Sequence, residues 1–375
     1  MKFKLITIAL ILIVSSAIGC NKKAEKSNSF QSESVVLTAE TQNLLKSLKS
    51  IPEKGFMIGH QDDPMYGIGW NGDANRSDIK SITGDYPAVM GFDLGRVELG
   101  NADNLDKVNF DKIRQEVIKQ YNRGGMITFS WHINNPMTDG DSWNNTPGAV
   151  KTLLPDSINH EKFIQWLQHG VDYLKTLKTA DRTKIPILFR PWHEHTGSWF
   201  WWGQDNCTAE EYKQLWIMTH DFFKEQGMDN LIWAYSPGAV NTTEEYMERY
   251  PGDEYVDLLG FDTYHFNNQK GTEDFTKIMN NMLTIITQLG KEKNKPIAVT
   301  ETGIESLPIA DWWTNVLFPV IDKYPISYVL VWRNAHDIAN HFYAPYPGQL
   351  SATDFVKFYQ NPKTLFNKDI QNLYK

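Results

Sequence analysis

The sequence predicts an α/β fold: a single (β/α)8 TIM barrel whose active site lies at the C-terminal ends of its strands. From Val35 onward, eight short apolar runs alternate with helical patterns. This order builds a parallel sheet, and eight such units can close into a barrel. Each run is also followed by polar or aromatic side chains, and a barrel gathers its strand ends on one face. The 375 residues suit one barrel preceded by a short N-terminal segment.

The predicted strands are short, continuous and apolar, as expected for parallel strands that are buried on both faces. In order they span residues 56–59, 88–92, 126–130, 187–190, 231–235, 258–262, 297–300 and 328–331. No internal repeat or linker interrupts the alternation, so we expect one domain over residues 37–375.

The stretches between these runs carry helix signals. Residues 110–119 and 275–289 repeat apolar side chains at helical spacing. The stretch 208–226 begins with Thr208 and Glu211, which form a capping box. The sequence therefore predicts helices between the strands.

The side chains that follow the strands are able to contact a ligand. In chain order they are His60, Asp93, Trp131–His132, His193–Glu194–His195, Ser236, Tyr264–His265, Glu301 and Trp332–Arg333–Asn334. Ordinary loops favour Ser, Asn, Asp and Gly. The abundance of His, Trp and Glu at these positions therefore indicates a binding or catalytic face.

Glu194 and Glu301 follow the fourth and seventh strands, so they face each other across the mouth of the predicted barrel. Glycoside hydrolysis needs such a pair, one acid for the leaving oxygen and one carboxylate at the anomeric carbon. Aromatic residues flank Glu194, and burial against them keeps a carboxyl protonated, so Glu194 fits the acid. Glu301 fits the nucleophile, held ionised by hydrogen bonds from neighbours such as Tyr264. The separation of the two carboxylates, and hence retention or inversion, stays open at this point.

Six motifs resemble those of glycoside hydrolase family 26, whose best-known members are β-mannanases. They are GHQDDP at 59–64, SWHINNP at 130–136, RPWHEHTGSWFWWG at 190–203, FDTYH at 261–265, VTETG at 299–303 and VWRNA at 331–335. The resemblance spans residues 55 to about 340. Its most specific part is the His-Glu pair followed by the Trp-rich loop.

The resemblance implies a role for each matching residue. Glu194 is then the acid/base and Glu301 the nucleophile of a retaining double displacement. His193 contacts the substrate or the nucleophile, and Tyr264 donates a hydrogen bond to Glu301. The remaining substrate-binding residues are His132, at the sugar under attack, and Trp199, Trp332 and Arg333, which contact flanking sugars.

The resemblance thus implies an endo-β-1,4-mannanase that cleaves β-mannan or mannooligosaccharides without a cofactor. Three alternatives remain open. One is an exo-acting enzyme that releases mannobiose. Another is a β-glycanase for mixed-linkage glucan or β-1,3-xylan. The third is a non-catalytic glycan-binding lipoprotein, against which the presence of both glutamates argues.

The tryptophans divide into two groups by position. Sugar rings have apolar faces that an indole can cover, so several of the tryptophans after strands are expected to form sugar platforms. The candidates are Trp131, Trp143, Trp199, Trp201, Trp202 and Trp332. For Trp201 and Trp202, one platform and one anchor is equally open. Those on helical patterns are expected to pack between helix and barrel; these are Trp166, Trp216, Trp312 and Trp313.

A metal site is the main alternative use of the histidines. His132, His193, His195 and His265 could form a ligand cage with Asp93. No HExxH motif is present, so we expect no catalytic metal and assign these histidines to hydrogen bonding. The pair Asp62–Asp63 is assigned either to a loop cap or to substrate hydroxyls.

The first residues resemble an export signal. Residues 1–19 carry a positive start and an apolar run too short to span a bilayer permanently. The run 17–20 resembles a bacterial lipobox, which implies a lipidated Cys20 as the mature N-terminus. Residues 20–36 are polar and read as a tether. We therefore expect an exported lipoprotein anchored in the outer membrane, on the periplasmic face rather than the cell surface, because residues 21–23 are basic rather than acidic.

Composition excludes other classes of protein. A formal net charge of −8 argues against a nucleic-acid partner. The content of 41% hydrophobic and 13% aromatic residues excludes a disordered chain. Lipidation of Cys20 would leave Cys207 as the sole thiol, so no intrachain disulfide is expected. We expect a monomer.

Overall fold

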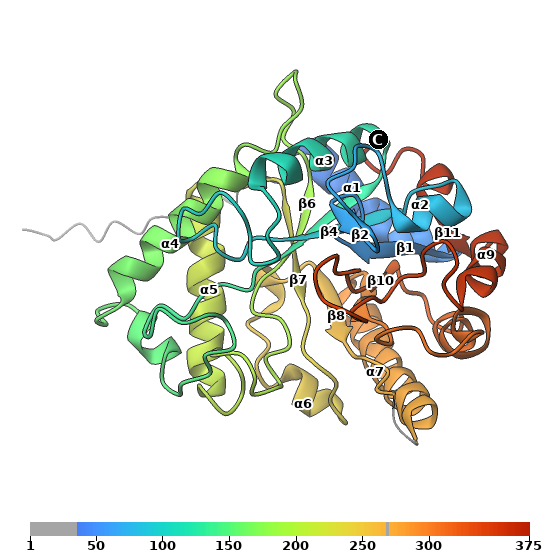
Figure 1. Ribbon diagram of the computed structural model, residues 1–375. Helices are drawn as coiled ribbons and strands as arrows, with labels where there is room; N and C mark the ends of the chain where they lie inside the picture. Colours follow the sequence, from blue (N-terminus) through green and yellow to red (C-terminus); the bar gives the residue numbers. More distant parts are fainter. Residues whose placement is uncertain (1–35, 268–269) are drawn as a thin grey trace, which may run out of the picture. The chain divides into compact units, whose positions relative to one another are not determined.

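The computed structural model describes residues 36–267 and 270–375. Its centre is a closed barrel of eight parallel strands, as predicted (Figure 1). The strands are β1 (Phe56–Gln61), β4 (Val89–Asp93), β5 (Met126–Ser130), β6 (Ile187–Arg190), β7 (Leu231–Tyr235), β8 (Leu258–Asp262), β9 (Ile297–Thr302) and β10 (Tyr328–Val331). They pair in chain order, and parallel pairing of β10 with β1, in the register Met57↔Tyr328, closes the barrel.

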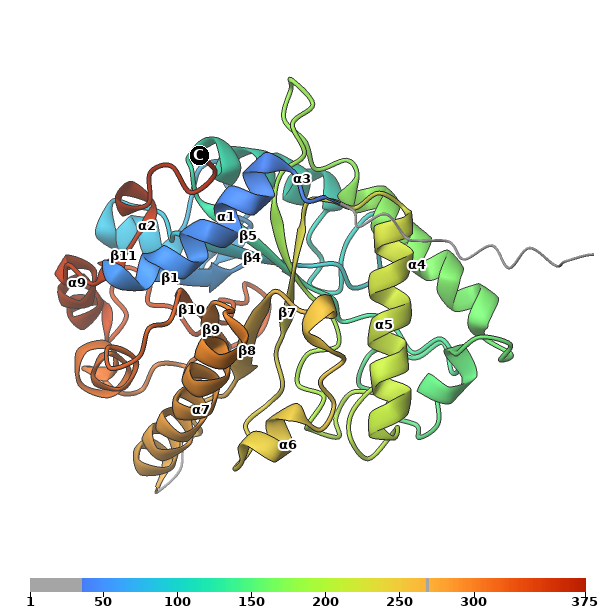
Figure 2. The ribbon, with the colours of Figure 1, turned by 180° about the vertical axis from the view of Figure 1, so that it is seen from behind.

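Helices surround the barrel: the first precedes β1, the last follows β10, and the others lie between successive barrel strands along the chain. They are α1 (Ala39–Ser50), α2 (Asp78–Thr83), α3 (Phe110–Asn122), α4 (His160–Leu174), α5 (Ala209–Glu225), α6 (Thr243–Met247), α7 (Gly271–Lys293), α8 (Phe318–Ile321) and α9 (Ala352–Gln360). A π-helical segment, Trp312–Leu317, precedes α8. Short 3-10 turns lie at Ile51–Glu53, Val150–Leu153, Asp253–Tyr255 and Asn367–Asp369. Figure 2 shows α5 and α7 flanking β7 and β8 on the outside.

The predicted helices form where the sequence places them. The capping box of α5 is present, because the Thr208 hydroxyl accepts from the backbone N–H of Glu211 and the Glu211 carboxylate accepts from that of Thr208. The other two helices, α3 and α7, contain the predicted stretches and are longer.

Three further strands are short. β2 (Tyr66–Gly67) and β3 (Trp70–Asn71) form an antiparallel hairpin after β1. β11 (Thr364–Leu365) pairs with the first residues of β1.

Alternate residues of each strand face two separate apolar clusters. On β6, Ile187 and Phe189 pack outward with residues of the surrounding helices, whereas Leu188 points into the barrel interior. The interior cluster includes Leu44 and Leu48 of α1. The end of the barrel opposite the strand C-termini is thus filled by apolar side chains, and the C-terminal ends of the strands remain for polar groups.

The predicted signal peptide, Cys20 and nearly all of the tether lie outside the described residues. Within the part of the chain that is described, no helix is long and apolar enough to cross a membrane.

Candidate active site

Glu194 sits in a tight turn directly after β6. Trp192 and Glu194 both adopt positive φ angles, 54° and 52°, which residues other than glycine rarely do. The turn is fastened by the Glu194 backbone N–H, which donates to the Ser236 carbonyl at the end of β7 (2.8 Å). Local strain of this kind is retained where surrounding contacts over-determine it, typically at functional sites.

Glu301 is brought to the mouth by an irregularity in β9. The register between β8 and β9 changes from Phe261↔Val299 to Asp262↔Glu301. The Thr300 hydroxyl donates to the inward-facing Asp262 carboxylate (2.6 Å). The next residue, Glu301, also faces inward, because its carboxylate contacts the Tyr264 hydroxyl and the Arg190 guanidinium. A bulge re-aims a side chain that regular alternation would turn to the opposite face.

The two glutamates lie close together. One carboxylate oxygen from each of Glu194, Asp262 and Glu301 falls within 4.8 Å of the others. Arg190, buried at the end of β6, donates to Asp262 (2.7 Å) and to Glu301. The positive charge of the guanidinium therefore compensates the negative charges of two buried carboxylates of this cluster. Burying these charges without a partner would cost free energy.

The carboxyl of Glu194 is tuned towards an acid that is protonated near neutral pH. Exclusion of water, followed by the negative charge of Glu301, raises the pKa of Glu194 to about 7. The Trp199 indole N–H donates to the same carboxylate (2.7 Å) and opposes the rise. Glu301 accepts instead from the Tyr264 hydroxyl (2.7 Å) and from Arg190. The two carboxyls thus have different surroundings, as an acid and a nucleophile require.

Two histidines stand beside the glutamates. His132 Nδ1 lies 2.7 Å from an Asp93 carboxylate oxygen, and its Nε2 lies 3.2 Å from His193 Nε2. Burial lowers the pKa of His132, but the charge and hydrogen bond of Asp93 outweigh it and raise the pKa overall. Burial and the positive charge of Arg190 hold the pKa of His193 well below its usual range. His193 is therefore a neutral imidazole in the wall of the site.

The remaining predicted residues line the cleft near His132. Trp143 stacks on His132 with ring centroids 5.3 Å apart and is 49% exposed. Trp332 meets the same imidazole edge-on at 6.0 Å. Arg333 is held by Asp106 (2.9 Å) and, with His132 and Trp143, lines a cavity of about 230 Å³. These side chains offer both apolar faces and hydrogen-bond donors to a sugar.

Three of the six tryptophans considered as sugar platforms are not exposed to a ligand. Trp131, Trp201 and Trp202 are almost fully buried. Their indole N–H groups are bonded to Glu98, the Ile133 carbonyl and the His193 carbonyl, respectively. They anchor the active-site loops, because a buried indole needs a partner for its N–H. Trp199 is 46% exposed and bonds Glu194, and Trp143 and Trp332 contact His132, so these three do reach the cleft. The four tryptophans expected to pack behind the barrel are buried.

Other candidates turn out to be structural. His195 contacts the Tyr235 hydroxyl (2.9 Å), and His265 accepts from Trp312 (3.0 Å), so both point away from the glutamates. Asp62 accepts from Tyr66 (2.7 Å), and Asp63 contacts His60 (2.8 Å). Both aspartates are buried and serve internal bonds; burial, then the charge of Asp106, raises the pKa of Asp62 to about 8.

Sequence reasoning missed two members of the cluster, Arg190 and Asp262. Both are the last residues of buried strands, β6 and β8, and both stand inside motifs that were singled out for other residues. The signal that could have found them is a charged residue at the end of an apolar strand. Such a residue is buried at the barrel mouth and therefore needs a partner of opposite charge there.

Comparison with known proteins agrees with this geometry. A model of the family described as glycosyl hydrolase family 26 matches residues 35–314. A mannan endo-1,4-beta-mannosidase of Bifidobacterium adolescentis is 30% identical over 367 residues, which cover 92% of this chain and 36% of the relative. A mannan endo-1,4-beta-mannosidase of Bacillus subtilis is 30% identical over 265 residues, 68% of each chain. The chain thus spans about a third of the first relative and two thirds of the second.

Solved structures are also similar. A GH26 beta-mannanase from Bacteroides ovatus superimposes with a TM-score of 0.88 and 54% identity, over 90% of this chain and 98% of that one. A modular endo-beta-1,4-mannanase from Cellulomonas fimi gives a TM-score of 0.82 and 30% identity, over 91% and 78%. With the family model matching most of the sequence, the chain belongs to glycosyl hydrolase family 26.

Proposed function

We propose that the chain is an endo-β-1,4-mannanase that hydrolyses mannan and mannooligosaccharides with retention of configuration. The retaining mechanism is supported by the distance between the two carboxylates, since one oxygen of Glu194 lies within 4.8 Å of one oxygen of Glu301. Retaining glycosidases hold their two carboxyl groups about 5–5.5 Å apart, whereas inverting enzymes need about 6.5–9.5 Å to admit a water molecule. The named activity of the relatives supports mannan as the substrate.

In the first step, the Glu301 carboxylate attacks the anomeric carbon while the Glu194 carboxyl gives its proton to the leaving oxygen. The glycosidic C–O bond breaks and an ester bond forms between the sugar and Glu301. The raised pKa of Glu194 keeps that proton available near neutral pH.

In the second step, the Glu194 carboxylate takes a proton from water, and the resulting hydroxide equivalent displaces Glu301 from the anomeric carbon. Once Glu301 is esterified, its negative charge no longer raises the pKa of Glu194. The same residue can therefore switch from acid to base. Before the attack, Arg190 and Tyr264 both donate hydrogen bonds to the Glu301 carboxylate.

Paired alanine variants test these roles. Glu301→Ala should lose measurable turnover on every substrate, because no nucleophile remains. Glu194→Ala should lose turnover on mannan but keep the glycosylation step on an activated aryl β-mannobioside, whose leaving group needs no proton, and added azide should speed its second step. Glu161→Ala, an exposed change on α4, is the control. Full mannanase activity in Glu301→Ala would sink the proposal.

The endo mode is tested by the products formed from linear mannan over time. An endo-acting enzyme releases a ladder of oligosaccharides from the first minutes. Mannobiose alone at early times would instead establish the exo-acting alternative, and hydrolysis of a mixed-linkage glucan in preference to mannan would overturn the substrate.

We also propose that Cys20 is lipidated and anchors the enzyme to the outer membrane, on the periplasmic side. The apolar run before Cys20 and the basic residues after it support this. The wild-type chain should sediment with membranes and resist protease added to whole cells, whereas Cys20→Ala should move to the soluble fraction. Digestion of the wild type on intact cells would place it on the surface instead.

A further inference from the structure

We propose that the end of the barrel opposite the catalytic mouth docks on an anionic phospholipid surface. This inference rests on the proposed lipid anchor and extends it, because an acyl chain on Cys20 would hold the domain close to a membrane. The docking region, called the basal face, comprises α1, residues 51–55 and 175–185, and the loops that lead into β7, β9 and β10 (225–230, 291–296 and 322–327). Docking there leaves the active site open on the side away from the membrane.

The described chain begins on the basal face. The Thr38 backbone N–H donates to the Asp229 carbonyl (2.9 Å), in the loop that leads into β7. The next residues form α1, which crosses the barrel at the start of the strands (Figure 2) and packs Leu44 and Leu48 into the barrel interior. The covalent connection to Cys20 therefore reaches the domain at this end.

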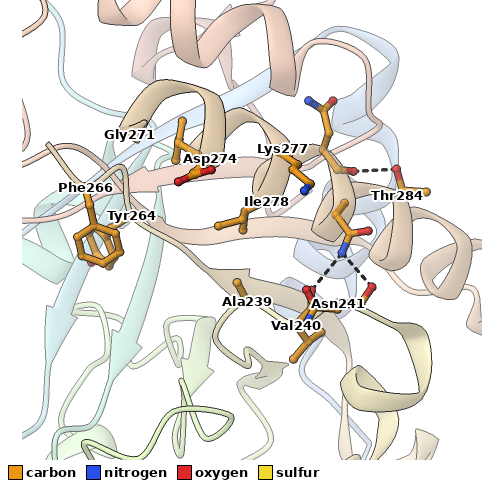
Figure 3. Close-up of a pocket in the computed structure, with 13 residues that line it drawn as sticks. Ala239, Val240, Asn241, Tyr264, Phe266, Gly271, Asp274, Lys277, Ile278 and Thr284 are labelled. Atoms are coloured by element: carbon orange, nitrogen blue, oxygen red, sulfur yellow. Dashed lines mark hydrogen bonds between the residues drawn. The ribbon is translucent and has the colours of Figure 1, made fainter. Parts of the chain in front are cut away.

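Helix α7 connects the basal face with the mouth. Its first residue, Gly271, lines a hollow together with Tyr264 (Figure 3), and Tyr264 donates to Glu301 in the active site. Its last turn contains Lys291, which belongs to the basal face. The catalytic glutamates and the basal cations thus lie at opposite ends of the domain.

A basic hollow of about 460 Å³ lies on the basal face, next to the loop into β7. Its charged lining consists of Lys175, Lys178, Arg182 and Lys184, and no described acidic side chain lines it. Lys184 is paired with Asp229 (2.6 Å). The other three cations form no ion pair within residues 36–267 and 270–375. Their charge is therefore available to an anion outside the protein.

Two of these cations stand on a hairpin that projects beyond the barrel, the lime-green loop before β6 in Figure 1. Lys178 and Lys184 form its antiparallel bridge, and Arg182 lies near its tip. Basic residues in the last turn of a helix often complement the helix dipole. That explanation does not apply to Lys178 and Arg182, because α4 ends before the hairpin. The one acidic residue of the hairpin, Asp181, accepts from the Thr179 hydroxyl.

A second basic hollow, of about 430 Å³, lies between α1 and the C-terminal end of α7. Lys49, Lys291 and Lys295 line it, again without an acidic side chain among the described residues. Lys49 and Lys291 are exposed. Lys295 is half-buried and donates to the backbone carbonyls of Asp253 and Val256. The basal face thus offers two separate pockets to anionic headgroups.

The charge of the basal face differs from that of the whole chain, whose formal net charge is −8. Besides the cations of the two hollows, Lys46, Lys54 and Lys323 are exposed there. The exposed acidic residues of the face are Glu53, Asp181, Glu225 and Glu292. The field of an anionic membrane decays within about 10 Å at 0.1 M salt, so it acts mainly on the nearest face. It therefore orients the domain with the basal cations towards the lipid and the acidic remainder away from it.

Vesicle binding tests the basal face without the anchor. The mature chain, without residues 1–19 and with Cys20→Ala, carries no acyl group. It should sediment with vesicles made of equal parts phosphatidylglycerol and phosphatidylcholine at low ionic strength, and not with vesicles of phosphatidylcholine alone. Added salt should release it, because screening weakens the attraction between the lysines and the lipid phosphates.

A triple variant in this mature chain locates the surface. Lys49→Gln, Lys178→Gln and Lys291→Gln together should weaken binding to the phosphatidylglycerol vesicles on the order of a hundredfold, at about fivefold for each cation removed. Its activity on mannohexaose in solution should stay that of the parent chain, because none of the three side chains lies at the mouth.

The matched control removes the same charge from the mouth side. Lys112→Gln, Lys151→Gln and Lys277→Gln change exposed lysines near the start of α3 and α7 and in the 3-10 turn after β5. This variant should bind the vesicles as tightly as the parent chain does. Both variants keep the lysines of the tether, so the contribution of the tether cancels between them.

Equal binding of the two triple variants, or no binding of the parent chain to the anionic vesicles, would overturn the docking face. The anchor fails by a different result, since a wild-type chain found in the soluble fraction of cells would overturn lipidation of Cys20. The vesicle measurement contains no acyl group and is independent of that outcome.

Discussion

At the scale of residues, the site is defined by how differently two carboxyl groups are surrounded. Glu194 has water excluded around it and the charge of Glu301 nearby, which raise its pKa to about 7. Glu301 has a guanidinium and a phenol as hydrogen-bond donors. Under the proposed mechanism, the same side-chain chemistry therefore serves as an acid in one place and as a nucleophile in the other.

The pH dependence of catalysis follows from this difference. Because Glu194 must be protonated to act as the acid, kcat/KM should fall as pH rises through about 7. The pH profile of kcat/KM for a mannooligosaccharide measures this fall, which is the alkaline limb of the profile. An activated aryl substrate that needs no acid should show a weaker fall, and an identical limb on both substrates would assign it to another group.

Trp199 modulates the same pKa. Its N–H bond to Glu194 favours the carboxylate and lowers the pKa. Trp199→Phe should therefore move the alkaline limb upward, by on the order of half a pH unit to one unit. Trp143→Phe changes an equally exposed indole of the cleft and should leave the limb in place. A downward shift in Trp199→Phe would contradict the assignment.

The strand-end positions of Glu194 and Glu301 and the bond from Tyr264 to Glu301 could be predicted at this scale, whereas the bonds of Arg190 could not. Both glutamates stand at strand ends with distinctive neighbours. The bonds of Arg190 reach residues 72 and 111 positions away, and such pairs depend on strand register, which the local sequence does not contain. Likewise Trp199 and Trp202 share one loop, yet the first is exposed and the second is buried, because the folding of the loop decides which indole faces water.

At the scale of elements, prediction succeeded where one local signal dominates. Runs such as β10 (Tyr328–Val331) are apolar throughout and have the predicted bounds in the structure. The β2–β3 hairpin and the π-helical segment before α8 were not predicted. Strands of two residues carry no periodicity, and α8 begins at Phe318 with a proline in its first turn, which breaks the preceding helical pattern.

The capping box of α5 offers a test at this scale. Thr208→Ala removes the hydroxyl that accepts from the Glu211 N–H and should lower the free energy of unfolding by about 1 kcal/mol. Urea denaturation measures the change. Thr208→Ser, which keeps the hydroxyl, should recover most of it; equal losses in both variants would show that the cap is not the cause.

At the scale of the whole molecule, the barrel explains why the prediction from sequence extended to function. Its topology brings every strand C-terminus to one face, so a list of residues after strands becomes a list of candidates for one site. It does not give distances across the mouth. The turn at Glu194 and the bulge at Glu301 set the separation of the carboxylates, and only the folded chain contains it.

We propose that Glu194 and Glu301, which have carboxylate oxygens within 4.8 Å of each other, catalyse a retaining double displacement. Proton NMR of a mannooligosaccharide during the first turnovers measures the configuration of the newly formed reducing end before mutarotation. The β-anomer should appear first and then equilibrate with the α-anomer. Initial formation of the α-anomer would mean a single displacement by water and would rule out the retaining mechanism.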